Sequence, residues 1–354
     1  MARPTIEEVR RDNAAYFETI MEDPHPLRAL KTHVRSIGAP VKEAKEGYEK
    51  MLSRMRVMRN NDSFLNFRRM SVGLMALDKS STVTGMDLLF MLCDTPAIFI
   101  MEKDIGTLLL ETDLKGSDYE DLKLPFRTIY IQLPQNPYKV WIKGEVGNLE
   151  GAYITQDTGD PGVSWTIVIL VGRKDDMLDP CDDCLFSMPV LLEAGPLDTQ
   201  VEMRLADLLR RKHEPEEVAN LTQFGDVFKW ILNCILYINS EGADLKRGWF
   251  HEKAAQTMKA AKGGKKRNIR HALEETSTEV TWVGRSVKIE KAHVEGEPRG
   301  PLDGPRAGPR LHMVRGFWRM QVHGAGRALR KKVWVKPFLR GEGREILEKV
   351  YKVE

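Results

Sequence analysis

Residues 230–238 read WILNCILYI and are the most apolar stretch of this 354-residue chain. They end a helix that the periodicity predicts over residues 216–238. Nine residues are about half of what a membrane span requires. A helix that is apolar nearly all round is buried. We therefore expect this helix to pack against a sheet in the core.

Period-two segments that precede this helix supply the sheet. They are residues 127–133 (RTIYIQL), 139–143, 151–155 and 164–171 (SWTIVILV). The gaps between them are short and rich in turn residues, whereas parallel crossovers need a dozen residues or more. An antiparallel sheet is therefore predicted.

Helical patterns dominate the first hundred residues and return before the apolar helix. We expect helices over residues 5–21, 41–59, 63–77, 84–93 and 199–212. The fold class predicted is α+β, with an N-terminal helical layer, a central antiparallel sheet with a buried helix, and a C-terminal basic β-hairpin.

Four regions follow from these patterns. Residues 1–100 form a helical N-terminal region, and residues 101–242 form an α+β core. Residues 243–311 form a basic, proline- and glycine-rich linker region, with one candidate hairpin at 279–290. Residues 312–354 form the basic C-terminal hairpin element.

Charge divides the chain unevenly, although its formal net charge is only +3. Residues 246–354 carry a net charge of +14, and the first 245 residues carry −11. Such asymmetry suggests a polyanionic partner. The alternative is a basic end that folds back onto the acidic body. The first residues contain no apolar signal segment, so we expect a cytoplasmic protein that does not enter a membrane.

Cysteines give no metal site. Cys181 and Cys184 form a single CxxC, and no second CxxC or histidine pair follows at zinc-finger spacing. We interpret this segment as an acidic turn, and we expect no metal and no cofactor.

The C-terminal segment is the most informative for function. Residues 312–322 (HMVRGFWRMQV) and 332–340 (KVWVKPFLR) fit two strands around the glycine turn at 323–327. If the apolar faces pair, one basic face with aromatic rings remains, which suits single-stranded nucleic acid. Its predicted contacts are Arg315, Phe317, Arg319, Arg327, Arg330, Lys331, Lys332, Trp334, Lys336 and Arg340. Two alternatives stay open: the acidic body covers this face, or its cations only solvate a sheet edge.

Catalysis on the same surface would need an acid or base near neutral pH. His312 and His323 are the weak candidates for a metal-independent ribonuclease. His312 falls on the apolar face and His323 lies in the turn, so we favour a protein that is not an enzyme. A phage structural or assembly protein without a nucleic-acid role is the third hypothesis.

The C-terminal segment resembles the signature of a family of phage and mobile-element proteins. The residues that carry the resemblance are 312–318 (HMVRGFW), the glycine turn, and 331–341 (KKVWVKPFLRG). This family includes the second class of type V-A anti-CRISPR inhibitors. Similar stretches are Leu124-Pro125 with residues 128–131, and Phe224-Gly-Asp with the apolar helix. Phe317 stands where the family has a second histidine, which weakens the nuclease hypothesis.

The resemblance implies action in the bacterial host against production of a CRISPR effector nuclease. Members recognise the nascent effector chain and cause loss of its messenger RNA. The implied partners are RNA or a ribonucleoprotein, including the ribosome, and the CRISPR effector itself. We expect the C-terminal signature to carry a general RNA or ribosome contact and the N-terminal region to select the partner.

Overall fold

A computed structural model describes most of the chain from residue 96 onward. The described residues are 23–28, 31, 47, 50, 53, 96–142, 145–157, 164–172, 184–191, 195–210, 215–263, 265–273, 277–289 and 312–340. The helices predicted at 5–21, 41–59, 63–77 and 84–93 lie outside them, apart from positions 47, 50 and 53.

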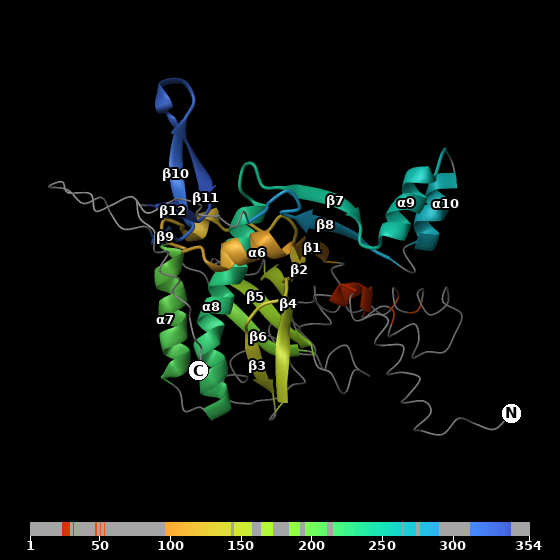
Figure 1. The fold of residues 1–354 in the computed structure, drawn as a ribbon. Coiled ribbons are helices and arrows are strands. Elements are labelled where there is room, and N and C mark those ends of the chain that lie inside the picture. Colours follow the sequence, from red (N-terminus) through yellow and green to blue (C-terminus); the bar gives the residue numbers. More distant parts are fainter. Residues whose placement is uncertain are drawn as a thin grey trace, which may run out of the picture.

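An eight-stranded sheet forms the centre of the structure (Figure 1). Its order is β6-β5-β4-β2-β1-β8-β7, and β3 pairs with β4 off this path. The bounds are β1 Ala97–Met101, β2 Thr128–Gln132, β3 Lys139–Ile142, β4 Glu145–Asp157, β5 Ser164–Gly172, β6 Cys184–Leu191, β7 Leu245–Trp249 and β8 Glu279–Val283.

The sheet is mixed, which corrects the antiparallel prediction. β1 runs parallel to both β2 and β8, and the other pairs are antiparallel. The connection from β1 to β2 contains helix α6 (Lys103–Leu110) and η1 (Tyr119–Asp121), which is long enough for a parallel crossover. The four residues after Ala97 in β1 are buried, so this end of the predicted helical region is a core strand.

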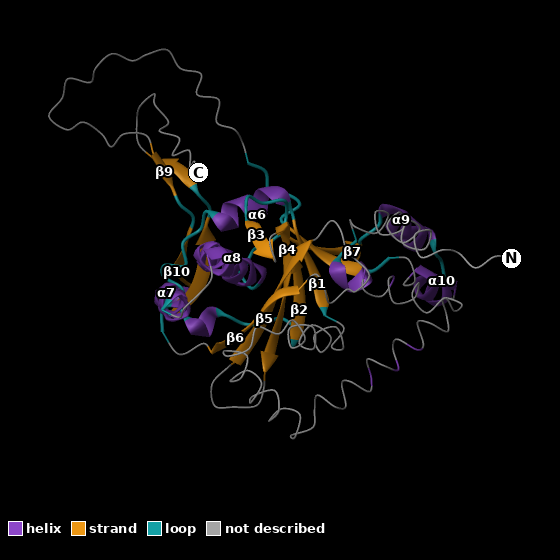
Figure 2. Cartoon of the chain, turned by 90° about the horizontal axis from the view of Figure 1, so that it is seen from below, coloured by secondary structure: helices purple, strands orange, loops and turns teal. Residues whose placement is uncertain are grey.

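Helices α7 (Leu197–Leu209) and α8 (Pro215–Ile238) lie on one face of the sheet (Figures 1 and 2). The buried helix and the α+β class are thereby confirmed. Ile231 and Ile235 are fully buried in one cluster with Ile129 of β2. Burial of each such side chain contributes about 1.5–3 kcal/mol. The indole N–H of Trp230 donates to the carbonyl of Gly106 at 2.9 Å, which joins α8 to α6.

A short N-terminal segment covers the opposite face of the sheet. Residues 25–28 form a helical turn after Pro24. The His25 ring nitrogen Nδ1 lies 2.9 Å from the Tyr153 hydroxyl, and Arg28 pairs with Glu150 at 2.7 Å. Tyr153 packs on Tyr130 with ring centroids 4.7 Å apart. Part of the predicted N-terminal layer therefore contacts the sheet through polar groups.

The region predicted as a linker extends the sheet. β7 and β8 pair directly with each other. The chain that connects them forms two helices, α9 (Glu252–Ala260) and α10 (Lys265–Leu273). The hairpin predicted within 279–290 is therefore wrong, because β8 takes its antiparallel partner from residues 245–249. The rest of the four-part division stays a prediction.

The C-terminal hairpin consists of two short sheets. β10 (Phe317–His323) pairs with β11 (Leu329–Val335), and β9 (His312–Val314) pairs with β12 (Phe338–Arg340). The turn between β10 and β11 contains η2 (Ala325–Arg327), where Gly324 and Gly326 have φ of 79° and 62°. This left-handed backbone favours glycine.

Among the described residues, no helix has the length and apolar character to cross a membrane.

Candidate interaction surface

The register of β10 and β11 decides what the hairpin presents. Trp318 lies opposite Trp334, and Met320 lies opposite Lys332. Directly opposed residues share one face of an antiparallel pair. The sequence predicted one apolar and one basic face for the hairpin. This prediction is wrong, because each face of the strand pair carries both apolar and basic residues. A difference of one residue in register exchanges the faces of one whole strand.

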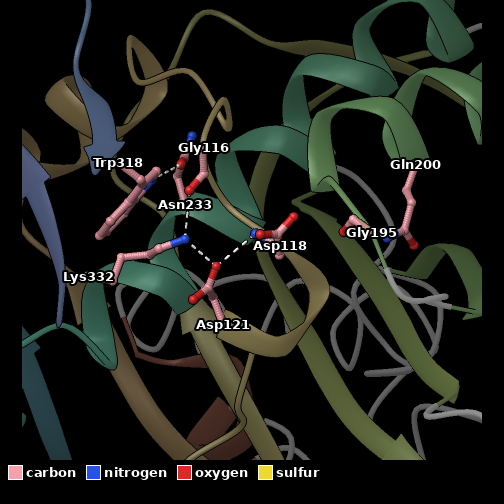
Figure 3. A network of polar contacts seen from close by, with 8 residues as sticks. All are labelled: Gly116, Asp118, Asp121, Gly195, Gln200, Asn233, Trp318 and Lys332. Carbon is pink, nitrogen blue, oxygen red and sulfur yellow. Dashed lines mark hydrogen bonds and ion pairs between the residues drawn. The ribbon is translucent and has the colours of Figure 1, made fainter. Parts of the chain in front are cut away.

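Trp318 anchors the hairpin to α8. Its side chain is 2 % exposed, and its indole N–H donates to the Asn233 side-chain oxygen at 2.8 Å (Figure 3). The Asn233 amide donates in turn to the carbonyls of Thr112 and Leu109, at 2.7 and 3.3 Å. Asn233 is fully buried within the apolar stretch. It joins three segments that are distant in sequence.

A second tryptophan holds the neighbouring strand. The indole N–H of Trp334 donates to the Thr112 hydroxyl at 3.2 Å. Its ring meets the Tyr237 ring edge-on, with centroids 5.3 Å apart. Trp334 is therefore engaged by the body, and the sequence argument for base stacking on this ring loses its main support.

Gly316 permits the close approach of the hairpin to the loop after α6. The Asp113 backbone N–H donates to the Gly316 carbonyl at 2.9 Å. A Cβ at Gly316 would lie 2.3 Å from the Thr112 hydroxyl oxygen, which is closer than real Cβ atoms approach. A side chain here would therefore push the hairpin away from the body.

Three hairpin cations face carboxylates of the body. Lys332 contacts Asp121 and donates to the Gly116 carbonyl at 2.7 Å, while Asp121 also accepts the Asp118 backbone N–H (Figure 3). In the same region Gln200 of α7 donates to the Gly195 carbonyl at 3.1 Å. The other two ion pairs are Lys331 with Glu241 at 3.0 Å and Arg315 with Asp113 at 3.7 Å. These three ion pairs agree with the alternative raised from the sequence, in which the basic end folds back onto the acidic body.

The far half of the hairpin leaves the body (Figure 1). We call it the distal arm and define it as residues 319–330. Its exposed cations are Arg319, Arg327 and Arg330. Met320, Val322 and Leu329 are also exposed, by 52, 36 and 57 %. The distal arm thus offers cations and apolar side chains together, which is typical of an interaction surface.

A family model matches the part of the sequence that contains the sheet, the buried helix and the hairpin. The anti-CRISPR type V subtype A2 family matches residues 99–341, from β1 to just beyond β12. The chain belongs to the anti-CRISPR type V subtype A2 family. This match confirms the resemblance seen in the C-terminal signature.

Comparison with solved structures gives a match of low similarity. The crystal structure of AcrVA2 matches with a TM-score of 0.45 and 12 % sequence identity. The match covers 89 % of this chain and 98 % of that chain. Comparison with curated protein sequences finds no match.

The fold of this anti-CRISPR family member keeps His312 and His323, the two candidate catalytic histidines, apart. His312 begins β9, and His323 ends β10, so they lie at opposite ends of the hairpin. His323 lies opposite Leu329 beside the turn. The two residues therefore do not form the acid–base pair of a ribonuclease.

The remaining predicted contacts are divided between exposed and partly buried positions. Phe317 is half-buried opposite Val335, and Lys336 is exposed between the two sheets of the hairpin. Arg340 is placed by its backbone pairing with His312. Cys184 begins β6, and Cys181 lies outside the described residues. Sequence reasoning missed Asn233, whose only signal was a polar residue within an apolar helix.

Proposed function

We propose that this anti-CRISPR family member reduces production of a type V-A CRISPR effector nuclease in the bacterial cytoplasm. It engages the nascent effector chain on the ribosome and causes loss of the effector messenger RNA, without being an enzyme itself. Membership of the anti-CRISPR type V subtype A2 family over residues 99–341 carries this proposal.

The distal arm is the surface that we assign to the ribonucleoprotein. Its base is fixed to the body by Trp318 and Trp334, while Arg319, Arg327 and Arg330 remain exposed. Lys336 adds a further exposed cation nearer the base. Arginine pairs well with phosphate, and the exposed apolar side chains suit a protein component. A rigid base with an exposed arm supports contact with a large partner.

Co-expression with a type V-A effector tests the mechanism. The messenger RNA of the effector is measured by quantitative PCR after reverse transcription, and the protein by immunoblot. We expect the parent chain to lower both. The variant R319Q/R327Q/R330Q should restore both, whereas K103Q/K123Q/K139Q, with the same charge change on exposed lysines of the body, should act like the parent.

Two results would contradict the proposal. Unchanged effector protein and messenger, combined with blocked DNA cleavage, would indicate direct inhibition of the finished nuclease. Cleavage of labelled RNA in EDTA by the purified chain, lost in His323→Ala or His312→Ala, would indicate a ribonuclease instead.

A further inference from the structure

The helix pair α9–α10 carries the densest positive charge of the described residues outside the hairpin. Residues 252–273 contain seven lysine or arginine residues and a single acidic residue, Glu252. Arg270 pairs with Glu279 of β8 at 3.0 Å. The other six cations are exposed: Lys253, Lys259, Lys262, Lys265, Lys266 and Arg267.

This pair lies far from the hairpin. Figures 1 and 2 place α9 and α10 side by side beyond β7, at the end of the molecule opposite to the distal arm. The short connection at 261–264 includes Gly263 with φ of 59°. It brings the end of α9 next to the start of α10. Lys259, Lys262 and Lys265 therefore gather at one end of the helix pair.

The start of α10 violates a local rule of helix stability. Lys265, Lys266 and Arg267 occupy its first three positions, and its first turn has no acidic residue. The N-terminus of a helix already carries partial positive charge, so cations there oppose helix formation. Natural sequences keep such local conflicts mainly at functional sites. A bound anion would remove the repulsion between these cations and the positive end of the helix.

We propose that the exposed cations of α9 and α10 bind the phosphate backbone of RNA, as a second surface separate from the distal arm. This inference rests on the proposed function, which supplies messenger RNA as the polyanion. Lysine binds phosphate as a point charge on a flexible stem, without reading bases. The nearest described rings already have partners, because Trp282 stacks on Phe250 and lies 3.8 Å from the Arg285 guanidinium. Binding should therefore be independent of sequence and sensitive to salt.

Fluorescence anisotropy of the full chain with labelled single-stranded 30-nucleotide poly(U) tests this surface between 50 and about 200 mM NaCl. The variant K265Q/K266Q/R267Q should bind at least about tenfold more weakly than the parent. Its slope of log affinity against log salt should be shallower by about 2, since each phosphate contact on a single strand contributes about 0.7. The matched K103Q/K123Q/K139Q variant should bind within about twofold of the parent.

Stability separates a binding role from a structural one. Glutamine is a good helix former and removes the repulsion at the helix start, so the melting temperature of K265Q/K266Q/R267Q should not fall. Unchanged RNA affinity in this variant would overturn the inference, as would equal weakening in the matched variant. Absence of RNA binding by the parent at 50 mM NaCl would also overturn it. In each case the measurements of effector messenger in cells still decide the proposed function.

Discussion

Replacement of Asn233 by leucine is the sharpest test of how the hairpin is held. The two side chains have similar size, so Asn233→Leu changes hydrogen bonding far more than volume. It removes the acceptor for the Trp318 indole N–H and the donor for the Thr112 carbonyl. The substitution also removes the hydrogen bond from the Asn233 amide to the Leu109 carbonyl. This carbonyl still accepts the backbone N–H of Thr112.

Two buried groups therefore lose their partner. Each buried donor or acceptor left without one costs about 1–3 kcal/mol, and the apolar leucine offsets part of this sum. We expect the free energy of unfolding to fall by about 2–4 kcal/mol. At about 2–4 °C per kcal/mol, the melting temperature should drop by roughly 4–16 °C.

A double-mutant cycle with Trp318→Phe isolates the hydrogen bond. Calorimetry or urea unfolding of the parent, both single variants and the double variant gives the coupling energy. We expect the double variant to lose about 1–2 kcal/mol less than the sum of the single losses, because the phenyl ring needs no acceptor. Asn268→Leu, at an exposed position of α10, is the control for the same substitution outside the core.

Additive losses within about 0.3 kcal/mol would refute the reasoning, since they would mean that Asn233 and Trp318 do not interact. A melting temperature of Asn233→Leu equal to that of the parent would refute it as well. Limited proteolysis gives an independent reading, because a released hairpin should be cut earlier in Asn233→Leu than in Asn268→Leu.

Three further outcomes follow from single positions. Gly316→Ala should lower the melting temperature in a thermal scan by several degrees through its clash with the Thr112 hydroxyl, and an unchanged melting temperature would contradict this. Hydrogen bonds from the Ser286 backbone N–H and hydroxyl lower the pKa of Asp244 in the folded chain. Its stabilisation is therefore present above the unfolded pKa of about 3.9 and is lost as the pH falls through the lower folded pKa. Asp244→Asn should thus be less stable than the parent in urea at pH 7, and the difference should narrow below about pH 4; a constant difference would contradict this. Burial raises the pKa of the Cys234 thiol, so iodoacetamide at pH 8 should label it only after unfolding, as read by peptide mass spectrometry.

The candidate site shows where sequence patterns stop being sufficient. The two arms and the glycine turn of the hairpin were predictable, because alternation and turn residues are local properties. The register was not predictable from them. Both tryptophans face the body since Trp318 finds an acceptor on Asn233 and Trp334 finds one on Thr112. Those acceptors belong to segments about 85 and 222 residues away.

The sheet shows the same limit. Strands β2, β4 and β5 were visible as alternating or apolar runs, and their antiparallel pairing followed from short gaps. β1 was missed because its five residues follow a long helical pattern. Its parallel pairing with β8 joins residues more than 180 positions apart. β7 and β8 were placed in a linker because two helices separate them.

The amino-acid sequence by itself determined the α+β class, the buried apolar helix, the basic hairpin and the family resemblance. These depend on composition, local periodicity and quoted motifs, which need no knowledge of distant contacts. Only the tertiary structure decided which cations are exposed. Lys331 and Lys332 meet carboxylates of the body, while the arginines of the distal arm and the cations of α9 and α10 remain exposed. The reason is that ion pairing and burial depend on which residues the fold brings within a few ångströms, and the net charge of a segment does not contain that information.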